Sequence, residues 1–470
     1  MAIARVRPTP GEAQVPPIGE PQPRRRLVFA IVSMALFMAS VDQTIVATAL
    51  GSLQHDLHST VNWSSWTITI YALGQIVAMP AAGTISDMYG RKKVFIGAVV
   101  LFTTASLCCG LASNIYMLVA LRAAQALGGG AFMPSATGIV ADLFGRDRDR
   151  AVGLFSSVFP IGGIVGPILG GIFVTYWSWR GIFLVNVPVG IILCCLALAF
   201  VPGGSKKSAN RLDVPGIGLL ATALLALMLA ISYLGSANAS PSHPLFLLLV
   251  GIGLVSMAFF VWHSSRATAP FVPLRLLAGH DFAIMNIINF LIGTAILGFG
   301  ALVPLYAEDR YHLPTLAAGT LLTARAIGMI TVAALATFAL RRTGYRLPML
   351  VGLSLAAIGL VLTAISPPTF GPYQWLAIGA GLTGIGLGMA LPASNNATLQ
   401  RAPENTAAVA GLRGMFRQSG GITGISLITA VAARSADPGL AIARSFLTLA
   451  AVLVLLLPAV FLVPDHRGHW

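Results

Sequence analysis

Apolar stretches separated by short polar connections fill the chain from residue 27 to residue 463. A helix needs roughly 20 apolar residues to cross ~30 Å of hydrocarbon. Lipid offers no partners to backbone groups, so each stretch must bond internally as a helix. The fourteen predicted spans, numbered in chain order, cover residues 27–50, 61–82, 94–113, 116–139, 151–174, 181–202, 214–234, 245–263, 282–306, 315–340, 347–366, 373–394, 406–432 and 445–463. The pattern predicts an all-α membrane protein with fourteen transmembrane helices.

Composition and the two ends of the chain agree with this class. Hydrophobic residues make up 56% of the chain and charged residues 9%, and the mean hydropathy is +0.83. Residues 1–26 are rich in proline and arginine and lack the apolar core and cleavage site of a signal peptide. We expect residues 1–26 to be a disordered cytoplasmic tail and the first span to be an uncleaved anchor. Residues 464–470 are expected to form a second cytoplasmic tail.

The net charge of +14 raises the question of a nucleic-acid partner, and its distribution answers that question. With a cytoplasmic amino terminus, 21 of the 29 lysines and arginines fall in the tails and cytoplasmic connections, four in outer connections and four within spans. This bias is the one that orients membrane helices with their basic loops in the cytoplasm. We expect both termini inside the plasma membrane (a bacterial inner membrane), membrane lipids around the helices, and no nucleic acid.

The cysteine spacing and the absence of catalytic motifs argue against disulfides, metal sites and enzyme active sites. The four cysteines form two adjacent pairs inside spans, Cys108 with Cys109 and Cys194 with Cys195, a spacing that fits neither disulfides nor zinc. The sequence has no P-loop, no cluster of metal ligands and no nucleophile elbow. We expect no cofactor, no metal and no enzyme activity.

Two connections resemble each other. The one after the second span reads GTISDMYGRKKV and the one after the tenth reads TFALRRTGYRLP, so both place a glycine and basic residues after an even-numbered span. Internal similarity of this kind is typical of transporters built from two repeats. We expect six-helix bundles at residues 27–202 and 282–463, with an inserted helix pair and its flanking loops at residues 203–281.

At the first of these connections the chain resembles the major facilitator superfamily, and specifically its 14-span drug:proton antiporter group. The family pattern Gly-x-Leu-x-Asp-x-x-Gly-Arg-Lys/Arg is matched, with isoleucine in place of leucine, by Gly83, Asp87, Gly90, Arg91 and Lys92. The resemblance implies a fold of two six-helix bundles and a latch that holds them together in the outward-facing state. Asp87 can accept bonds from a helix N-terminus, and Arg91 can pair with Asp142. A purely topological basic loop is the alternative.

Two further patterns of the family lie inside spans. In the fourth span, Arg122, Gln125 and Gly128 match Arg-x-x-Gln-Gly-x-Gly, with Ala126 in place of the first glycine. The fifth span matches the antiporter pattern Gly-x-x-x-Gly-Pro-x-x-Gly-Gly at Gly162, Gly166, Pro167, Gly170 and Gly171. The resemblance implies export, and close helix packing at these glycines is the simpler interpretation.

Two signatures of the 14-span group complete the resemblance. The first span reads VDQTIVATALG, where the group has Leu-Asp-x-Thr-Ile-Val-Asn-Val-Ala-Leu-Pro. The residues entering the sixth span match Trp-Arg-x-x-Phe-x-x-Asn-x-Pro-x-Gly at Trp179, Arg180, Phe183, Asn186, Pro188 and Gly190.

Asp42 stands out because, of the 15 acidic residues, it alone lies well inside a span. It lies about 22 Å along the first helix. Burial disfavours a charged carboxylate, so we expect Asp42 to face the central cavity and to exchange a proton or bind a cationic substrate. The alternative is a permanent ion pair with Arg122, which otherwise snorkels to the outer surface.

The second half offers other candidates for proton coupling or substrate binding. Arg413 and Arg417 share one face of the thirteenth span and should repel each other. We expect Arg413, which is nearer the inner edge, to reach the cytoplasm. Glu308 and Asp309, near the outer edge, can bind cations or protons or form a solvated rim. Arg341 stands where the repeat would carry the latch aspartate, so a symmetric latch is not expected.

Together these features predict a proton-coupled antiporter that exports hydrophobic or cationic drugs by alternating access, and so confers multidrug efflux and antibiotic resistance. Its partners are then a small drug-like molecule and protons, and we expect a monomer. Export of a lipid or an endogenous metabolite is an alternative within the same class. A transport-inactive sensor or scaffold is a third possibility, against which the intact antiporter patterns argue.

Overall fold

The computed structural model describes residues 22–59, 61–203, 213–234, 240–267, 270, 280–365, 371–400 and 406–463. Helices account for nearly all of these residues, and none of them forms a strand. Ten predicted spans each lie on a single long helix: α3 Val61–Tyr89, α4 Arg91–Gly110, α5 Ile115–Phe144, α10 Val214–Leu234, α11 Pro244–Arg266, α15 Thr315–Thr343, α16 Arg346–Ala364, α17 Pro372–Gln400, α18 Thr406–Ala433 and α19 Pro438–Val460.

The other four predicted spans are interrupted helices. The first and fifth are α1 Gln22–Ile45, followed by a 3₁₀ turn and α2 Leu50–Asp56, and α6 Arg148–Ser156 with α7 Val158–Tyr176. The sixth and ninth are α8 Gly181–Leu184 with α9 Asn186–Phe200, and α13 His280–Gly293 with a π-helical turn and α14 Phe299–Tyr311. The fourteen helices predicted from the hydropathy pattern are therefore present.

One expectation about these helices needs correction, and one helix differs from the rest in its composition. Helix α1 begins at Gln22, so the last residues of the predicted disordered tail are helical, while residues 1–21 and 464–470 lie outside the described residues. Thirteen helices of the described chain are long and apolar enough to span a membrane, and α18 is not among them. Helix α18 has the length, but Arg413, Arg417 and Gln418 make it more polar than its neighbours.

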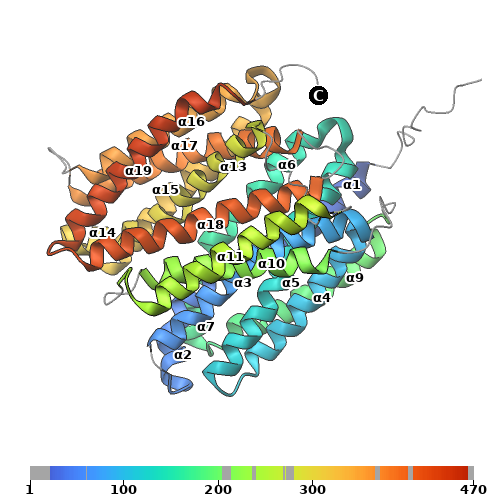
Figure 1. The fold of residues 1–470 in the computed structure, drawn as a ribbon, viewed down its shortest axis with the longest axis horizontal. Helices are drawn as coiled ribbons and strands as arrows, with labels where there is room; N and C mark the ends of the chain where they lie inside the picture. Colours follow the sequence, from blue (N-terminus) through green and yellow to red (C-terminus); the bar gives the residue numbers. More distant parts are fainter. Residues whose placement is uncertain are drawn as a thin grey trace, which may run out of the picture.

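The helices form two groups that lie side by side (Figure 1). One apolar core joins α1, α3, α4, α5 and α9, and a second joins α13 to α19. Helix α10 packs against α11 and contacts both α3 and α18, so the additional pair lies along the seam between the groups (Figure 1). The first core also takes in Val409, Ala410 and Leu412 from the start of α18, so the two groups are packed together there.

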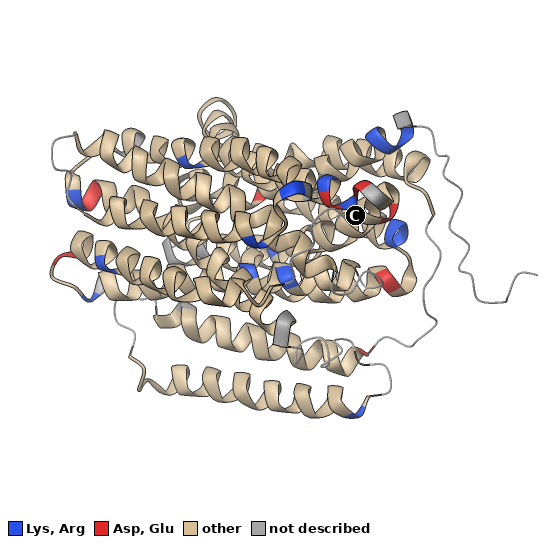
Figure 2. Cartoon of the chain, turned by 90° about the horizontal axis from the view of Figure 1, so that it is seen from above, with Lys and Arg blue, Asp and Glu red and all other residues tan. Residues whose placement is uncertain are grey.

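The two ends of the bundle differ in their chemistry. We call the latch end the one at which α3 finishes at Tyr89, α5 finishes at Phe144 and α18 begins at Thr406. The far end is the one at which α1 finishes and α5 begins. Acidic and basic residues gather at both ends, while the middle of the bundle is almost free of them apart from a few blue segments (Figure 2).

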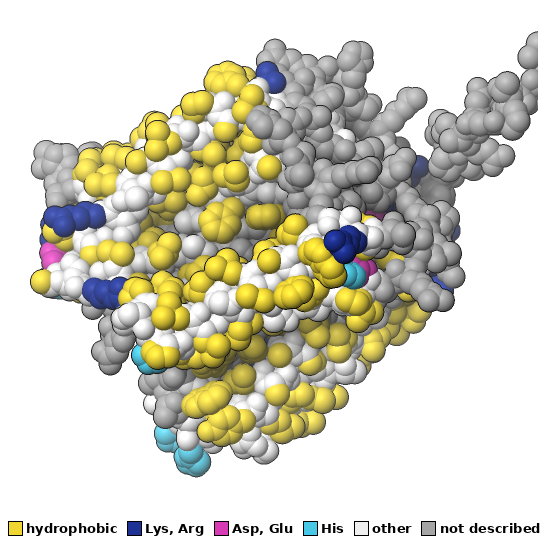
Figure 3. Space-filling model, viewed as in Figure 1, with side chains coloured by type: hydrophobic (Ala, Val, Ile, Leu, Met, Phe, Trp, Pro, Cys, Tyr) yellow, Lys and Arg dark blue, Asp and Glu magenta, His cyan; other side chains and the backbone are white. Residues whose placement is uncertain are grey.

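On the face shown in Figure 3, apolar side chains cover much of the described surface between the two ends. Helix α11 shows this most clearly, because only 11% of the apolar stretch of this helix is buried inside the protein. Leu248, Val255 and Trp262 on that helix are 58%, 56% and 52% exposed. Water would not tolerate an apolar surface of this extent, whereas lipid does.

Candidate functional site

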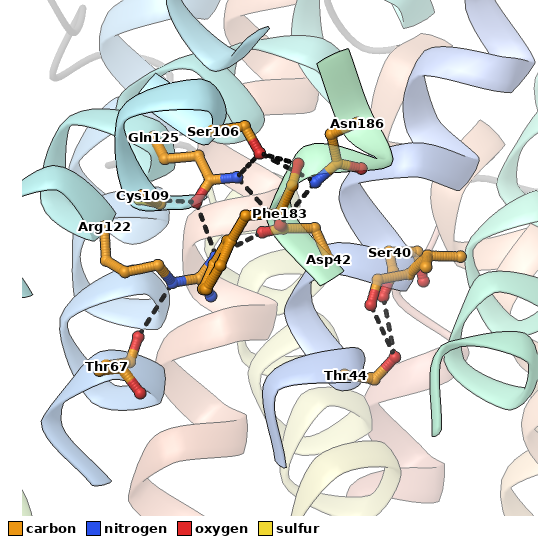
Figure 4. Close-up of polar contacts among 11 residues, drawn as sticks. Ser40, Asp42, Thr44, Thr67, Ser106, Cys109, Arg122, Gln125, Phe183 and Asn186 are labelled. Carbon is orange, nitrogen blue, oxygen red and sulfur yellow. Dashed lines mark hydrogen bonds and ion pairs between the residues drawn. The ribbon is translucent and has the colours of Figure 1, made fainter. Parts of the chain in front are cut away.

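A buried ion pair joins Asp42 on α1 to Arg122 on α5 (Figure 4). Arg122 Nη1 lies 2.6 Å from Asp42 Oδ2, and both side chains are 0% exposed. Removing either partner would leave an uncompensated charge in an apolar interior, which is costly, so each side chain needs the other. Arg122 therefore does not snorkel to the surface.

Three amide and hydroxyl side chains complete the network around this pair (Figure 4). Gln125 Nε2 and Asn186 Nδ2 both donate to Asp42 Oδ1, at 2.9 and 3.0 Å. The same two groups contact Ser106 Oγ at 3.0 and 3.1 Å, and Ser106 donates to the Phe183 carbonyl. Helices α1, α4, α5 and α9 thus meet at one carboxylate, which accepts bonds on both oxygens.

Arg122 is held from its other sides as well. Its Nε donates to the Thr67 carbonyl on α3 at 3.2 Å, and its Nη1 donates to Gln125 Oε1 at 2.8 Å. The guanidinium lies over the ring of Tyr71, 4.0 Å from the ring centre, which is a favourable cation–π distance. The rigid contacts on both sides fix the position of the guanidinium against Asp42.

This geometry determines what Asp42 can do in the conformation described. Its carboxylate is stabilised in the charged form by one cation and two amide donors. It is wholly buried and does not face an open cavity, in contrast to the sequence expectation. Of the two roles that the sequence left open, the ion pair with Arg122 is the one present here.

The glycines of the antiporter pattern bring α7 against α1, next to Asp42. A Cβ added to Gly162 would lie 2.6 Å from the Cβ of Ser40, and Gly166 and Gly170 likewise have no room beside Thr44 and Thr48. Ser40 Oγ also donates to a carbonyl of α7, at 2.5 Å. The pattern therefore serves close helix packing.

The other two residues of that pattern differ in position. Gly171 has open space where a side chain would be, and Pro167 lies within α7 between the packed glycines. Only part of the pattern therefore touches α1. Substituting a glycine that touches α1 can be compared with substituting Gly171, which lies on the same helix and does not.

The latch residues gather at the end of α3. Arg91 is 6% exposed, and its Nη2 lies 3.2 Å from Asp87 Oδ1. Its Nη1 contacts Asp142 Oδ2 and the Gly138 carbonyl on α5. Asp87 Oδ2 accepts a bond from the Ala408 N–H in the first turn of α18, at 3.0 Å. First-turn N–H groups have no partner within their helix, so this bond ties α3 to α18.

Three other residues of the pattern have separate tasks. Gly90 has φ of 100°, which other residues rarely adopt, and so allows the turn from α3 into α4. A Cβ on Gly83 would lie 2.8 Å from the Ala408 Cα, so α3 and α18 touch there. Lys92 lies apart from the latch, because its Nζ donates to the Leu198 carbonyl on α9.

A second set of contacts between the two groups was not foreseen from the sequence. Asp149 Oδ2 on α6 accepts bonds from Tyr345 Oη at 2.8 Å and Gln400 Nε2 at 3.2 Å. Asn396 donates to the Asp149 carbonyl at 2.9 Å. Burial, with Asp149 adding to it, raises the pKa of Tyr345, so its hydroxyl stays protonated and donating. We call these four residues the α6 clasp.

The α6 clasp joins the two groups at the latch end by a second set of hydrogen bonds. Its acid lies on the first group and its donors on the second, whereas the side chain of Arg341 lies outside the described residues. The only sign of this contact in the sequence was an acidic residue, Asp149, next to the fifth predicted span. No pattern within one sequence pairs that residue with Tyr345.

The arginines of α18 are arranged opposite to the prediction. Arg413 is 0% exposed, so the expectation that it reaches the cytoplasm is wrong. Arg417 is partly exposed, lies 6.0 Å from the Phe159 ring centre and has its Nη2 3.2 Å from Met133 Sδ. Close packing of α18 on α3 and α5 closes the route by which Arg413 would reach solvent.

The acidic residues of the second group lie far from both arginines. Glu308 is partly exposed and Asp309 exposed near the end of α14, at the far end. Neither has a bond to the Asp42 network among the described contacts. Arg310 beside them pairs with Asp437 at 3.3 Å, where both side chains are well exposed.

Comparison with known proteins identifies the family. The sequence profile of the Major Facilitator Superfamily matches residues 32–425. This chain belongs to the major facilitator superfamily. Among the relatives and the solved structures that it resembles are proteins named as transporters.

Relatives with curated names are bacterial transporters. The chain is 34% identical to the uncharacterized MFS-type transporter Rv1877 of Mycobacterium tuberculosis over 78% of its own length, and it spans about half (53%) of that relative. It is 29% identical to the multidrug transporter protein MdtP of Bacillus subtilis, covering 87% of this chain and 76% of MdtP. It is 29% identical to the multidrug resistance protein B homolog of Mycobacterium tuberculosis, over 91% and 82% of the two chains.

Solved structures share the fold. The human organic anion transporter MFSD10 superposes with a TM-score of 0.68 at 16% identity, covering 94% of this chain and 100% of that one. The proton:xylose symporter XylE superposes with a TM-score of 0.66 at 12% identity, covering 95% and 97%. At these identities the likeness shows the major facilitator fold alone.

Proposed function

We propose that this transporter is a proton-coupled antiporter that exports hydrophobic small molecules, drugs included, across a bacterial plasma membrane by alternating access. The observation that carries the proposal is Asp42: a carboxylate on α1, buried in the interior and held by Arg122 and Gln125 from α5 and by Asn186 from α9. A proton on Asp42 would remove the negative charge that holds Arg122 and release the contacts among α1, α5 and α9. Protonation and helix arrangement are thereby linked.

Alternating access requires contacts between the two groups that can break. The latch bond from Asp87 to α18 and the α6 clasp are such contacts, and both lie where α3 and α15 end. Hydrogen bonds of this kind are individually worth about 1.5–3 kcal/mol when one partner is charged, so a small set can be made and broken in each cycle. We infer that the two six-helix groups, residues 27–202 and 282–463, rock about this seam.

Orientation follows from the distribution of basic residues. The positive-inside bias places the latch end in the cytoplasm, with both termini, and the far end outside. The conformation described is then closed toward the cytoplasm. Asp42 lies in the outer half of its helix, so its proton would arrive from outside, where the electrochemical gradient supplies it.

The substrate class rests on the relatives and on the lining of the seam. MdtP and the protein B homolog carry multidrug names, and few charged residues lie in the middle of this bundle (Figure 2). A hydrophobic molecule suits such an interior. Export of a lipid or an endogenous metabolite by the same cycle is the alternative, since several relatives have no stated substrate.

Inside-out vesicles with an imposed pH gradient test the proposal. Neutral, cationic and anionic lipophilic compounds would be added in turn, and the collapse of the gradient followed for wild type and Asp42→Asn. Collapse by some compounds, lost in the variant, supports antiport coupled through Asp42. If the gradient still collapses in Asp42→Asn, the protein is an antiporter whose proton site is not Asp42, and Glu308 is the next candidate. No response to any compound would contradict drug antiport.

A further inference from the structure

Arg413 is a wholly buried cation without a partner. Its exposure is 0%, and none of its three guanidinium nitrogens has a hydrogen-bond partner among the described residues. A guanidinium stays protonated at any pH a cell experiences, so it cannot escape this cost by losing its charge. Buried charges are normally paired, and buried polar groups without partners are rare. Arg413 therefore lacks a partner that the described part of the chain does not supply.

The neighbourhood of Arg413 has a surplus of positive charge. Arg417 follows one helical turn later. A third cation of the second group, Arg325 on α15, is 8% exposed and lies elsewhere, beside Gly300 of α14. The acids of the second group whose side chains the structure describes are Glu308, Asp309 and Asp437, none of which is buried. In contrast to Asp42 and Arg122 in the first group, the interior of the second group carries cations with no ion pair in the part of the chain described.

A second unpartnered side chain lies opposite Arg413 on α13. Helices α13 and α18 touch where Gly420 meets the Phe290 backbone and Gly293 meets that of Arg417, too closely for a Cβ on either glycine. Asn286 precedes Gly293 by seven residues, and Arg413 precedes Gly420 by seven. The two helices run parallel, because Gly293 lies against Arg417 and Gly298 further along lies against Gly424. Seven residues are two helical turns, so both side chains lie on the facing surfaces at about the same level.

Asn286 shares the unusual state of Arg413. It is 2% exposed, and neither its Oδ1 nor its Nδ2 has a hydrogen-bond partner in the part of the chain that the structure describes. Two side chains on facing surfaces that bond neither to each other nor to neighbours leave several donors free. The guanidinium offers a planar set of N–H groups, and the amide offers two more. That donor set suits an oxyanion, above all a carboxylate, sulfonate or phosphate.

We propose that Arg413 and Asn286 form an anion site that binds the acidic group of the transported molecule, and that the substrates are amphiphilic anions. This inference rests on the proposed transport function and narrows its substrate class. It reverses the sequence expectation of cationic drugs, because the interior acid, Asp42, is already neutralised by Arg122. The apolar seam then holds the hydrophobic body of the substrate, and the guanidinium holds its charge.

Equilibrium binding to the purified full-length protein in lipid nanodiscs tests the site without a pH gradient. The probes share one ring system and differ in charge: 1-naphthylacetate, 1-naphthylacetamide and 1-naphthylmethylammonium. We expect wild type to bind the acetate at least about tenfold more tightly than the amide, which is ~1.4 kcal/mol, and to bind the ammonium most weakly. Because no gradient is used, failure of proton coupling would leave this result unchanged.

Three variants separate a binding role from a structural one. Arg413→Met should bring the Kd of the acetate to that of the amide and leave the amide's Kd unchanged, while Arg413→Lys keeps part of the preference. Asn286→Leu should weaken the acetate selectively. Arg310→Met, which removes a surface guanidinium, should change none of the three affinities.

Thermal stability supplies an independent measurement. Removing an unpaired buried charge should raise the Tm of ligand-free Arg413→Met above that of wild type, whereas losing a structural partner would lower it. Equal affinities for the three probes in wild type would overturn the proposal. So would a lower Tm together with weaker binding of all three probes in Arg413→Met. Stabilisation by chloride or inorganic phosphate, with no charge preference among the probes, would assign the site to a resident ion and overturn the substrate class.

Discussion

Neutralising Asp42 gives the sharpest test of the ion pair at the centre of the first group. In Asp42→Asn the amide oxygen can still accept from Gln125 and Asn186, which both bond Oδ1. The new amide nitrogen, however, replaces Oδ2, which now lies 2.6 Å from Arg122 Nη1. The ion pair is then replaced by two N–H donors that face each other, and the charge of Arg122 stays buried without a counter-ion. Breaking a buried pair by removing one partner costs about 3–5 kcal/mol, and we expect a loss in that range.

A double-mutant cycle separates the pair from its surroundings. Arg122→Met alone leaves Asp42 as the uncompensated charge and should cost about as much. The double variant has no charge to bury, so it should be more stable than either single variant, with a coupling energy of about 3 kcal/mol. Free energies of unfolding can be measured by SDS titration in mixed micelles, followed by far-UV circular dichroism.

The surface pair of Arg310 and Asp437 is the matched control. Its atoms lie 3.3 Å apart, but its side chains are 36% and 49% exposed, so solvent screens the charges. Asp437→Asn should therefore cost no more than about 1 kcal/mol. If Asp42→Asn costs as little as this control, or if the two single losses simply add in the double variant, the buried pair does not stabilise the protein as argued.

Three further predictions concern the contacts between helices. Gly166→Ala should destabilise by about 1–3 kcal/mol, because its Cβ meets Thr44 on α1, whereas Gly171→Ala, which faces open space, should be neutral in the same unfolding assay. Asp87→Asn weakens the bond to α18 and should increase alkylation of a cysteine introduced at the latch end; unchanged labelling would contradict a latch. Tyr345→Phe removes one bond to Asp149, worth about 1.5–3 kcal/mol, and should raise the same labelling; labelling equal to wild type would contradict a role for the α6 clasp.

Hydropathy was a reliable guide to the helices, because the requirement it reflects is local. Each span must satisfy its own backbone in lipid, so twenty apolar residues in a row suffice to predict it. The latch could likewise be located from the sequence, since Gly90 needs its positive φ and Asp87 lies within a turn of Arg91. Even the ion pair of Asp42 and Arg122 was one of two stated alternatives. These features depend on neighbours along the chain or on how deep a residue lies in its span.

Contacts between helices distant in sequence were decided by tertiary packing. Asn186 was part of a recognised signature, yet nothing in that signature pointed it at Asp42, 144 residues away. The bond between Tyr345 and Asp149 spans 196 residues. Distances of this kind depend on the rotation of each helix about its axis, which hydropathy does not define when most faces are apolar.

Arg413 shows the physical reason most clearly. Sequence alone determined that an arginine lies near the inner edge of a span, and one close to an edge normally snorkels to water. Whether it can do so depends on which face it occupies and what packs there, and glycines on α13 and α18 bring those helices too close together. The sequence determined which charges enter the membrane, because that is a matter of depth along a helix. Only the tertiary structure decided which of them are paired, because pairing is a matter of direction around it.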